Sequence, residues 1–375
     1  MTIVIIPSFA CNFRCKYCYL HNTTKLSQQE LRAEFVCSVL NQFKQQIHNL
    51  GEKLTLIWHG GEPLLWGYDN YCKIFEFIQQ ELSDITIQNS IQCNLSLIDL
   101  RYIELFKLYN VKVGFSLDGQ KEINDEQRVY VNGGGTFDKI MENLELCRTN
   151  GLQVGCVAVC SKKHVGRIKQ LYHFMNNHKL NFKLNPLFET GEATNVKDEL
   201  GITAMEYADI MTELFDLCIN DKNNTIVEEN LIEMSSAVAT GVTKHCLFGY
   251  NCQDNFMAIA PSGDVMPCGR FCDNDLLQYS YGNLHRESLA DILPRIKRTE
   301  TYKRAEYIAQ SGCAKCKWFN ICHGGCLHDG FLASGDFRHK TFLCPAYKKI
   351  FAHIDRCLNE TNRKTDYPLS QTKSM

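Results

Sequence analysis

The stretch "TIVIIPSFACNFRCKYCYL", residues 2–20, joins a short apolar run directly to a loop with three cysteines. Its β-branched residues predict a buried strand over residues 2–7. Cys11, Cys15 and Cys18 follow with the spacing Cys-x3-Cys-x2-Cys. A structural zinc site or an iron–sulfur cluster held wholly by protein needs four ligands, so three thiolates leave one coordination position open. The stretch therefore predicts a metal centre, at the end of a strand, that can bind a substrate or a cofactor.

Five further apolar, β-branched runs follow, with longer amphipathic stretches between them. We expect strands at residues 54–59, 85–93, 111–117, 154–159 and 181–187, and helices at residues 28–48, 69–82, 97–109 and 136–150. Strands buried on both faces and joined by helical crossovers indicate a parallel sheet. Six such units predict an α/β fold, a partial (β/α)6 version of the eight-unit barrel. Its functional loops should follow the C-terminal ends of the strands.

The composition is that of an ordinary soluble protein, with 375 residues, 45% hydrophobic and 22% charged. The formal net charge of -2 gives no reason to expect a nucleic-acid partner. No apolar run approaches the roughly 20 residues that cross a membrane, and the N-terminus has no signal-peptide pattern. We therefore expect a cytoplasmic protein without a membrane partner.

The chain contains 20 cysteines, which three readings could explain. Disulfides would require export, which nothing in the sequence supports. Scattered buried thiols explain most isolated cysteines: Cys37, Cys72, Cys147, Cys156, Cys160, Cys218 and Cys357. Cys93 is less certain because it lies in a polar motif. The remaining cysteines form tight groups, which indicates metal ligands, although Cys-x2-Cys alone would suit zinc as well as iron.

Most of the grouped cysteines lie in the last third of the chain: Cys246, Cys252, Cys268, Cys313, Cys316, Cys322, Cys326 and Cys344. They give the chain three expected parts. A barrel over residues 1–200 is followed by a helical connector at 201–240 and a cysteine-rich domain at 241–357. The polar, aperiodic tail at 358–375 is predicted to be disordered.

Polar motifs follow two of the predicted strands. In "WHGGEPLL" (58–65) the two glycines would let the backbone approach a ligand closely, and the carboxylate of Glu62 suits an ammonium group. The competing interpretation is a tight turn with a solvated glutamate. "VGFSLDG" (113–119) contains Ser116 and is followed by Arg128, whose guanidinium can pair with a carboxylate in a bidentate manner. An ordinary surface arginine is the alternative there.

Taken together, the cysteine loop and these motifs resemble the radical S-adenosylmethionine (SAM) enzymes. In that family the three thiolates hold a 4Fe–4S cluster whose fourth iron is chelated by SAM. One electron cleaves SAM, and the resulting deoxyadenosyl radical abstracts a hydrogen atom. The resemblance implies that Cys11, Cys15 and Cys18 are the cluster ligands.

The resemblance also implies a set of SAM-binding residues. "IQCNLS" (91–96) resembles the Gln-Thr-Asn-Gly motif of the peptide-modifying branch only partly, because Cys93 and Leu95 replace Thr and Gly. Ser116 and Arg128 correspond to the residues that hold the SAM carboxylate. The full set that the resemblance implies is Tyr17, Gly60, Gly61, Glu62, Asn94, Ser116 and Arg128.

The later cysteines, with "GNL" (282–284) and "CHGGC" (322–326), resemble the SPASM domain of anaerobic sulfatase-maturating enzymes and related peptide maturases. That domain carries two auxiliary 4Fe–4S clusters. Carried over by position, the first cluster is held by Cys246, Cys252, Cys268 and Cys326. The second is held by Cys313, Cys316, Cys322 and Cys344. The expected cofactors are thus SAM and three 4Fe–4S clusters, the auxiliary pair transferring electrons.

The sequence departs from the sulfatase maturases at Gly269. Those enzymes carry an Asp there, directly after the third cysteine of the first auxiliary cluster, as the base that deprotonates the substrate. Glycine has no such group, and Asp118, Glu189 and Asp273 are weak candidates for a base elsewhere. "CGRF" (268–271) is closer to peptide maturases that join an aromatic ring to a neighbouring Cβ. Cys272 is either a spare ligand or, as we expect, a buried thiol.

The sequence therefore predicts a radical SAM oxidoreductase that modifies a precursor peptide, forming a carbon–carbon cross-link between an aromatic ring and a Cβ. The alternatives are an anaerobic sulfatase maturase that makes formylglycine, a thioether-forming maturase, and an iron–sulfur electron carrier without SAM chemistry. Expected partners are the precursor peptide and an electron donor such as flavodoxin or ferredoxin. Because the sequence begins at the first barrel strand, leader recognition is expected to use the barrel rim, the tail or another protein.

Overall fold

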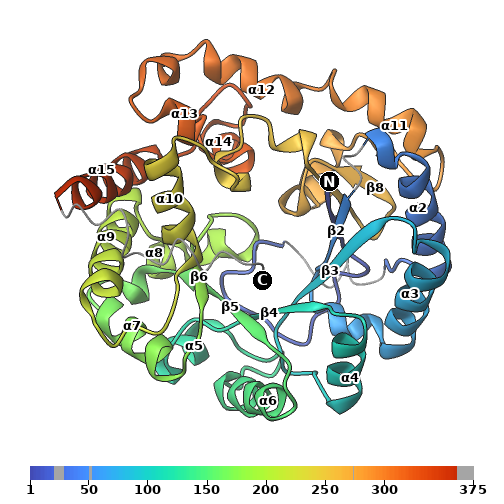
Figure 1. The fold of residues 1–375 in the computed structure, drawn as a ribbon, viewed down its shortest axis with the longest axis horizontal. Helices are drawn as coiled ribbons and strands as arrows, with labels where there is room; N and C mark the ends of the chain where they lie inside the picture. Colours follow the sequence, from blue (N-terminus) through green and yellow to red (C-terminus); the bar gives the residue numbers. More distant parts are fainter. Residues whose placement is uncertain (21–28, 50–52, 273, 361–375) are drawn as a thin grey trace.

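The computed structural model describes residues 1–20, 29–49, 53–272 and 274–360, and one sheet of nine strands runs through it (Figure 1). The strand order is β6-β5-β4-β3-β2-β1-β7-β8-β9. Strands β1 to β6 are all parallel and lie side by side in chain order. They span Thr2–Ile5, Lys53–Trp58, Thr86–Cys93, Lys112–Ser116, Val154–Cys160 and Phe182–Pro186. All six predicted strands are confirmed within two residues at either end, as is the α/β fold class.

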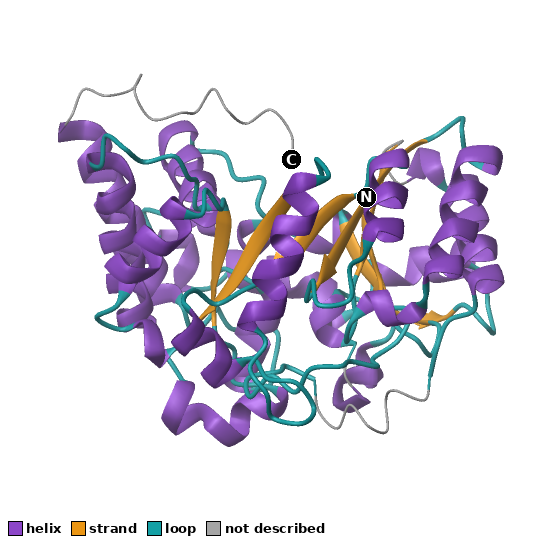
Figure 2. Ribbon diagram, turned by 90° about the horizontal axis from the view of Figure 1, so that it is seen from below, coloured by secondary structure: helices purple, strands orange, loops and turns teal. Residues whose placement is uncertain are grey.

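Helices follow the strands and cover the outside of the curved sheet (Figures 1 and 2). The helices of the barrel region are α2 (Ala33–Gln45), α3 (Tyr68–Glu81), α4 (Leu100–Leu108), α5 (Lys121–Gln127), α6 (Phe137–Thr149), α7 (Ile168–Asn177) and α8 (Lys197–Leu200). The predicted helices at 69–82, 97–109 and 136–150 agree closely with α3, α4 and α6. The prediction at 28–48 began too early, because α2 starts at Ala33. The helical connector consists of α9 (Ala204–Asn220) and α10 (Glu229–Thr240).

The first strand of the cysteine-rich region extends the barrel sheet. Strand β7 (Phe256–Ile259) pairs in parallel with β1, and β8 (Asp264–Met266) and β9 (Gly282–Asn283) continue the sheet with antiparallel pairing. A second apolar cluster crosses the same boundary, with Val4 of β1 and the following Ile6 packed among residues such as Met266 and Phe271. The two regions therefore share both a sheet and a core.

The rest of the cysteine-rich region is made of short helices and turns. Its helices are α11 (Leu289–Ile296), α12 (Glu300–Ala309), α13 (Phe319–Cys322), α14 (Leu327–Ser334) and α15 (Cys344–Glu360). Helix α15 packs against the connector helices α9 and α10, beside which Figure 1 shows it. The tail predicted to be disordered lies, from residue 361 on, outside the described residues. Within the described ranges no helix is long and apolar enough to cross a membrane.

Candidate functional site

The loop with the first three cysteines is fixed against the end of β2 by backbone contacts. The N–H of Gly61 donates to the carbonyl of Ser8 at 3.2 Å, and the N–H of Glu62 donates to that of Ala10 at 2.8 Å. A Cβ at Gly60 would lie 2.3 Å from the Ser8 oxygen, and one at Gly61 2.4 Å from the Ala10 oxygen. We expected these glycines to admit a ligand. In the structure they admit the protein's own cysteine loop, because two backbones pass without room for a side chain.

Glu62 is buried and is neither solvated nor free. One carboxylate oxygen accepts the N–H of Leu64 at 2.9 Å, and the other accepts that of Asn94 at 2.6 Å. Burial raises the pKa of Glu62 to about 7, although these two hydrogen bonds oppose the shift. The alternative of a solvated glutamate is therefore wrong. The side chain joins the turn after β2 to the end of β3, which positions both elements beside the cysteine loop.

The end of β3 is tied to the cysteine loop by a network of amides and a hydroxyl. Asn94 donates to Asn12 at 2.8 Å, Asn12 donates to Ser96 at 2.9 Å, and Ser96 donates to Asn94 at 2.7 Å. Leu95 has a φ of +64°, the left-handed conformation that glycine adopts without strain. This explains why a glycine stands there in the family motif. Leu95 keeps that conformation while its carbonyl accepts a hydrogen bond from Asn143.

Arg128 lies in a buried chain of polar groups that reaches the cysteine loop. Its Nη1 donates to the Tyr17 hydroxyl at 2.7 Å, and that hydroxyl in turn donates to Asp118. The other oxygen of Asp118 accepts the N–H of Val159 at 2.9 Å. Arg128 is thus not the ordinary surface arginine that was the alternative. Its buried Nε makes no hydrogen bond to the described residues. A buried guanidinium N–H without an acceptor fits a negatively charged ligand that the protein alone does not supply.

Ser116, at the end of β4, is half-buried and accepts a hydrogen bond from Gln92 at 3.2 Å. Gln92 covers Gly114, where a Cβ would lie 2.2 Å from its side-chain oxygen. The ends of β3 and β4 are therefore joined by side chains, as those of β2 and β3 are joined through Glu62.

The three thiols of the loop lie close enough to affect one another's ionisation. Burial raises the pKa of Cys11 to about 12 and that of Cys18 to about 11, and the neighbouring Cys15 adds to both shifts. The positive charge of Arg128 acts in the opposite direction on Cys15. Protonated thiols do not bind iron, so metal binding here would release protons. Three thiols within a buried, polar-lined strand end fit a cluster with an open position.

The eight later cysteines lie near one another in two groups. In the first, Cys252 and Cys268 interact electrostatically with Cys246, and Cys268 also with Cys326. In the second, Cys322 interacts with the three others that were assigned to it, Cys313, Cys316 and Cys344. These four cysteines line one pocket, together with Trp318, Lys340, Lys348 and several apolar residues. Two sets of four thiols fit two fully ligated clusters.

The first of these groups faces the barrel through a short junction. The guanidinium of Arg270 lies 3.7 Å from the centre of the Phe188 ring, in the loop after β6. Its Nη1 donates to buried Asp329 at 2.9 Å and lies 3.8 Å from the Cys326 sulfur. Three residues after Phe188, a Cβ at Gly191 would lie 2.3 Å from the Tyr19 carbonyl oxygen. The β6 loop therefore contacts both the first cysteine loop and the surroundings of the later group.

The structure separates the three candidates for a base. Asp118 is completely buried, and its two oxygens accept hydrogen bonds from Tyr17 and Val159. In this arrangement it cannot reach a substrate, so we no longer propose it as the base. Asp273 lies outside the described residues. Glu189 is exposed, in the junction loop beside Phe188. Gly269 lies against the barrel, where a Cβ would lie 3.3 Å from Val4.

Cys272, the possible spare ligand, is buried in the second apolar cluster, and its thiol contacts the carbonyl of Cys268. The residues that sequence reasoning missed are Asn12, Ser96, Gln92 and Arg270. Gln92 and Ser96 stood within a quoted motif, so their position at a strand end was a usable signal. Arg270 offered only its place next to Gly269.

Comparison with known proteins gives the family. Residues 5–162 match the Radical SAM superfamily, and residues 246–317 match SPASM, an iron-sulfur cluster-binding domain. An uncharacterized protein of Methanothermobacter thermautotrophicus is 34% identical over 215 residues, which are 57% of this chain and 78% of that protein. A cysteine-type anaerobic sulfatase-maturating enzyme of Clostridium perfringens is 24% identical over 376 residues, covering 96% of this chain and 98% of the relative.

Solved structures share the fold at lower sequence identity. One, described as native anSMEcpe with bound AdoMet and Cp18Cys peptide, aligns with a TM-score of 0.83 at 23% identity, over 96% of this chain and 98% of that one. Streptococcus suis SuiB bound to precursor peptide SuiA aligns with a TM-score of 0.65 at 20% identity, over 92% of this chain and 75% of SuiB.

The chain belongs to the radical SAM superfamily and carries a C-terminal SPASM domain. It is therefore a radical SAM enzyme with iron–sulfur cofactors rather than a simple electron carrier. The match to the SPASM domain ends at residue 317, before Cys322, Cys326 and Cys344. These three cysteines lie outside the matched range, and their nearness to the earlier cysteines is seen only in the structure.

Proposed function

We propose that this enzyme is a peptide maturase that oxidises a side chain of a ribosomally made precursor peptide and forms a ring-to-Cβ cross-link. The observation that carries the proposal is the junction between the two cysteine regions. The β6 loop contacts the Cys18–Tyr19 backbone through Gly191 and stacks Phe188 on Arg270, beside the first SPASM group. A peptide at this junction would lie between the site of hydrogen abstraction and a site that accepts an electron.

The proposed cofactor site uses residues from four strand ends. Cys11, Cys15 and Cys18 would hold the first cluster, and with SAM bound the centre supplies the one-electron chemistry that takes a hydrogen atom from the substrate. The free Nε of Arg128, with Ser116, would bind the SAM carboxylate. Gly60, Gly61, Glu62 and Asn94 would shape this site through the backbone, because the Glu62 carboxylate is already used within the protein. Tyr17 would orient Arg128.

The two later groups would hold two further 4Fe–4S clusters, three in all. A hydrogen atom, one electron and one proton must leave the peptide to give a product lighter by two hydrogens. The cluster of the first SPASM group would accept the electron and would pass it on to an acceptor in the cytoplasm. A flavodoxin or ferredoxin would supply the electron for SAM cleavage.

The proton requires a base, for which we propose Glu189. It is exposed in the junction loop, whereas Gly269 has no side chain and Asp118 is inaccessible. Glu189→Gln should lower the rate of product formation by roughly 100-fold or more, which is typical of a lost general base, and should leave the KM for the peptide little changed. Glu213→Gln, an exposed glutamate of α9, is the matched control. Equal rates for Glu189→Gln and wild type would exclude Glu189.

Formylglycine formation remains the second candidate because sulfatase-maturating relatives align with almost the whole chain at 24% identity. Oxidation of a Ser to formylglycine and ring-to-Cβ cross-linking both remove two hydrogens, so a mass shift alone does not decide between them. Oxidation of a Cys to formylglycine also exchanges the sulfur for the oxygen of a water molecule and releases hydrogen sulfide. In the deciding experiment, the reconstituted enzyme is incubated with two peptides. The first is encoded by a short open reading frame beside the gene of this enzyme, and the second is a sulfatase-type Cys or Ser peptide.

We expect the first peptide to lose two hydrogens across two residues, one of them aromatic, and the second to stay unchanged. A two-hydrogen loss confined to one Ser, or an exchange of sulfur for oxygen with loss of two hydrogens at one Cys, would overturn the cross-linking proposal in favour of formylglycine if the product aldehyde reacts with hydrazine reagents. A loss that joins a Cys sulfur to another residue would instead identify a thioether-forming maturase.

A further inference from the structure

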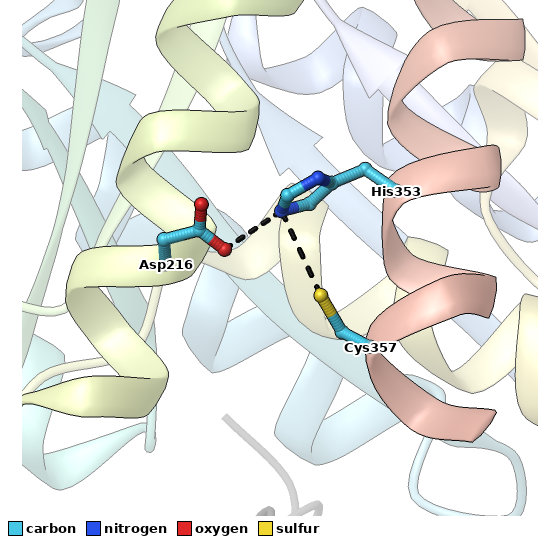
Figure 3. Close-up of side chains that lie close together, drawn as sticks. All are labelled: Asp216, His353 and Cys357. Carbon is cyan, nitrogen blue, oxygen red and sulfur yellow. Dashed lines mark hydrogen bonds and ion pairs between the residues drawn. The ribbon is translucent and has the colours of Figure 1, made fainter. Parts of the chain in front are cut away.

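Three metal-binding side chains gather between α9 and α15, apart from the three cysteine groups (Figure 3). His353 and Cys357 are four residues apart on α15, so they lie on one face of that helix. Asp216 comes from α9, which packs along α15. Sequence analysis predicted that Cys357 is an isolated buried thiol, but in the structure it is half-buried and lies beside Asp216 and His353. Cys357 lies 13 residues after Cys344, which is about 20 Å along the helix.

The atoms of this cluster converge on one nitrogen. Nε2 of His353 lies 2.7 Å from Oδ1 of Asp216 and 3.8 Å from Sγ of Cys357 (Figure 3). In a Cys-His-Asp catalytic triad, the carboxylate and the nucleophile contact opposite nitrogens of the ring. Here both contact the same nitrogen, so the arrangement cannot relay a proton from the thiol to the ring and on to the carboxylate.

A metal ion would be bound by ligand atoms that all point to one place, as these three do. Zinc is bound by sulfur at about 2.3 Å and by nitrogen or oxygen at about 2.0–2.2 Å, which places tetrahedral ligand atoms about 3.3–3.7 Å apart. The sulfur–nitrogen distance of 3.8 Å is slightly longer than this range, so the two atoms need to move together only a little. The oxygen–nitrogen distance must open by about half an ångström, and Asp216 is free to move because its side chain is 46% exposed. All three ligand atoms lie within 4.8 Å of one another.

The imidazole of His353 is held in place by its surroundings. Its ring packs edge-on against Phe215, and its side chain is only 15% exposed. Arg356 lies 2.9 Å from Nδ1, so in the metal-free protein Nδ1 accepts and Nε2 carries the proton toward Asp216. An ion would replace that proton. Nδ1 would then become the protonated nitrogen, and the exposed Arg356 would swing away.

We propose that Asp216, His353 and Cys357 bind one divalent transition-metal ion, with zinc as the preferred ion and water at the fourth position. The ion joins helix α15 to helix α9 of the helical connector. The site is independent of the peptide chemistry proposed above, and it concerns a cysteine that the iron–sulfur groups do not use.

The test uses full-length protein reconstituted anaerobically with iron and sulfide, so that the other cysteines are occupied. The protein is dialysed against Zn²⁺, washed and analysed for zinc and iron. Wild type should retain about one zinc per chain, and His353→Ala, Cys357→Ser and Asp216→Asn should each bind it at least roughly 100-fold more weakly. Cys37→Ser, which changes a half-buried thiol of α2, is the matched control and should bind zinc like wild type.

X-ray absorption at the zinc edge separates this site from zinc trapped at the cluster cysteines. One sulfur and three nitrogen or oxygen ligands support the proposal, whereas an all-sulfur shell overturns it. Equal zinc retention by wild type and the three variants also overturns it. Asp216→Asn keeps the test valid if a substitution at His353 or Cys357 impairs folding, because the Asp216 side chain is half-exposed. The iron content of the same sample shows whether the variant protein has kept its clusters.

Discussion

The barrel end and the SPASM region both gather cysteines, but they position them by different means. Around the first loop, strands β1 to β4 bring together groups that are far apart in sequence, and hydrogen bonds through Glu62, Asn94 and Arg128 tie the strand ends to one another. In the SPASM region the cysteines lie on short 3-10 turns and at helix ends, such as Cys246, Cys313 and Cys322. The only described strands there are three short ones, β7 to β9.

This difference indicates which of the two regions needs bound metal in order to fold. The barrel site is built at the ends of paired parallel strands, whose backbone hydrogen bonds involve no metal, so we expect the sheet to form without a cluster. The turns that carry the SPASM cysteines lie outside the sheet and are connected by single hydrogen bonds, such as that between His323 and the Phe248 carbonyl. We therefore expect the metal to supply much of their stability. The predictions below test this contrast, starting with the largest expected effect.

Replacing Cys11, Cys15 and Cys18 together by Ser should abolish SAM cleavage and lower the iron content from about twelve to about eight per chain. The protein should remain folded, with hydrogen-exchange protection of β1 to β4 unchanged. Replacing Cys313, Cys316, Cys322 and Cys344 should also remove about four irons. Here, SAM cleavage should persist while residues 312–326 lose protection. If the barrel variant loses its sheet protection instead, the contrast is wrong.

Glu62→Ala leaves the N–H groups of Leu64 and Asn94 buried without their acceptor. Each such loss costs about 1–3 kcal/mol, so we expect the free energy of unfolding to fall by about 2–6 kcal/mol. Anaerobic thermal or urea denaturation would measure this, with Glu213→Ala at an exposed site of α9 as the control. A variant as stable as the control would mean that Glu62 is not the structural link between β2 and β3.

Arg128→Ala should weaken SAM binding by roughly ten- to hundredfold, because a charge-assisted hydrogen bond of about 1.5–3 kcal/mol is lost. Arg128→Lys should not restore the affinity, since lysine has no group equivalent to the unpaired Nε. Equilibrium dialysis with SAM measures the affinity, and the iron content shows that the cluster is retained. Arg101→Ala, on the surface of α4, is the control. Normal SAM binding by Arg128→Ala would place the SAM carboxylate elsewhere.

Arg270→Met should make the reduction potential of the first SPASM group more negative. A positive charge near a ligand sulfur favours the reduced, more negative cluster, so its removal favours the oxidised one. A loss of about 1 kcal/mol corresponds to roughly 45 mV for a one-electron couple. A redox titration followed by electron paramagnetic resonance would measure the shift, with the second SPASM group as the internal control. An equal shift in both groups would contradict the role of Arg270.

The sequence was most informative where one physical signal dominates. Buried β-branched runs located all six barrel strands, because a strand covered on both faces has few alternatives to an apolar composition. The assignment of the eight later cysteines to two clusters came from a family resemblance and stays a prediction. The pairing of Cys326 with the earlier group could not be read from spacing alone.

What the sequence could not predict are contacts across the fold. Gly60 and Gly61 were assigned to a ligand, yet they face the backbone of Ser8 and Ala10. Asp118 looked available as a base, but Tyr17 and Val159 occupy its oxygens. In each case, the residue type was informative, and the partner came from a segment far away in the chain.

The pairing of β7 with β1 has a consequence for dissecting the enzyme. A fragment ending at Thr240 would lack β7 and expose the N–H and C=O groups along β1, an apolar strand at the open edge of a parallel sheet. Such an edge readily pairs with another chain, so the isolated barrel should self-associate or aggregate. The antiparallel pair of β7 and β8 thus protects β1 from intermolecular association, a role unrelated to electron transfer.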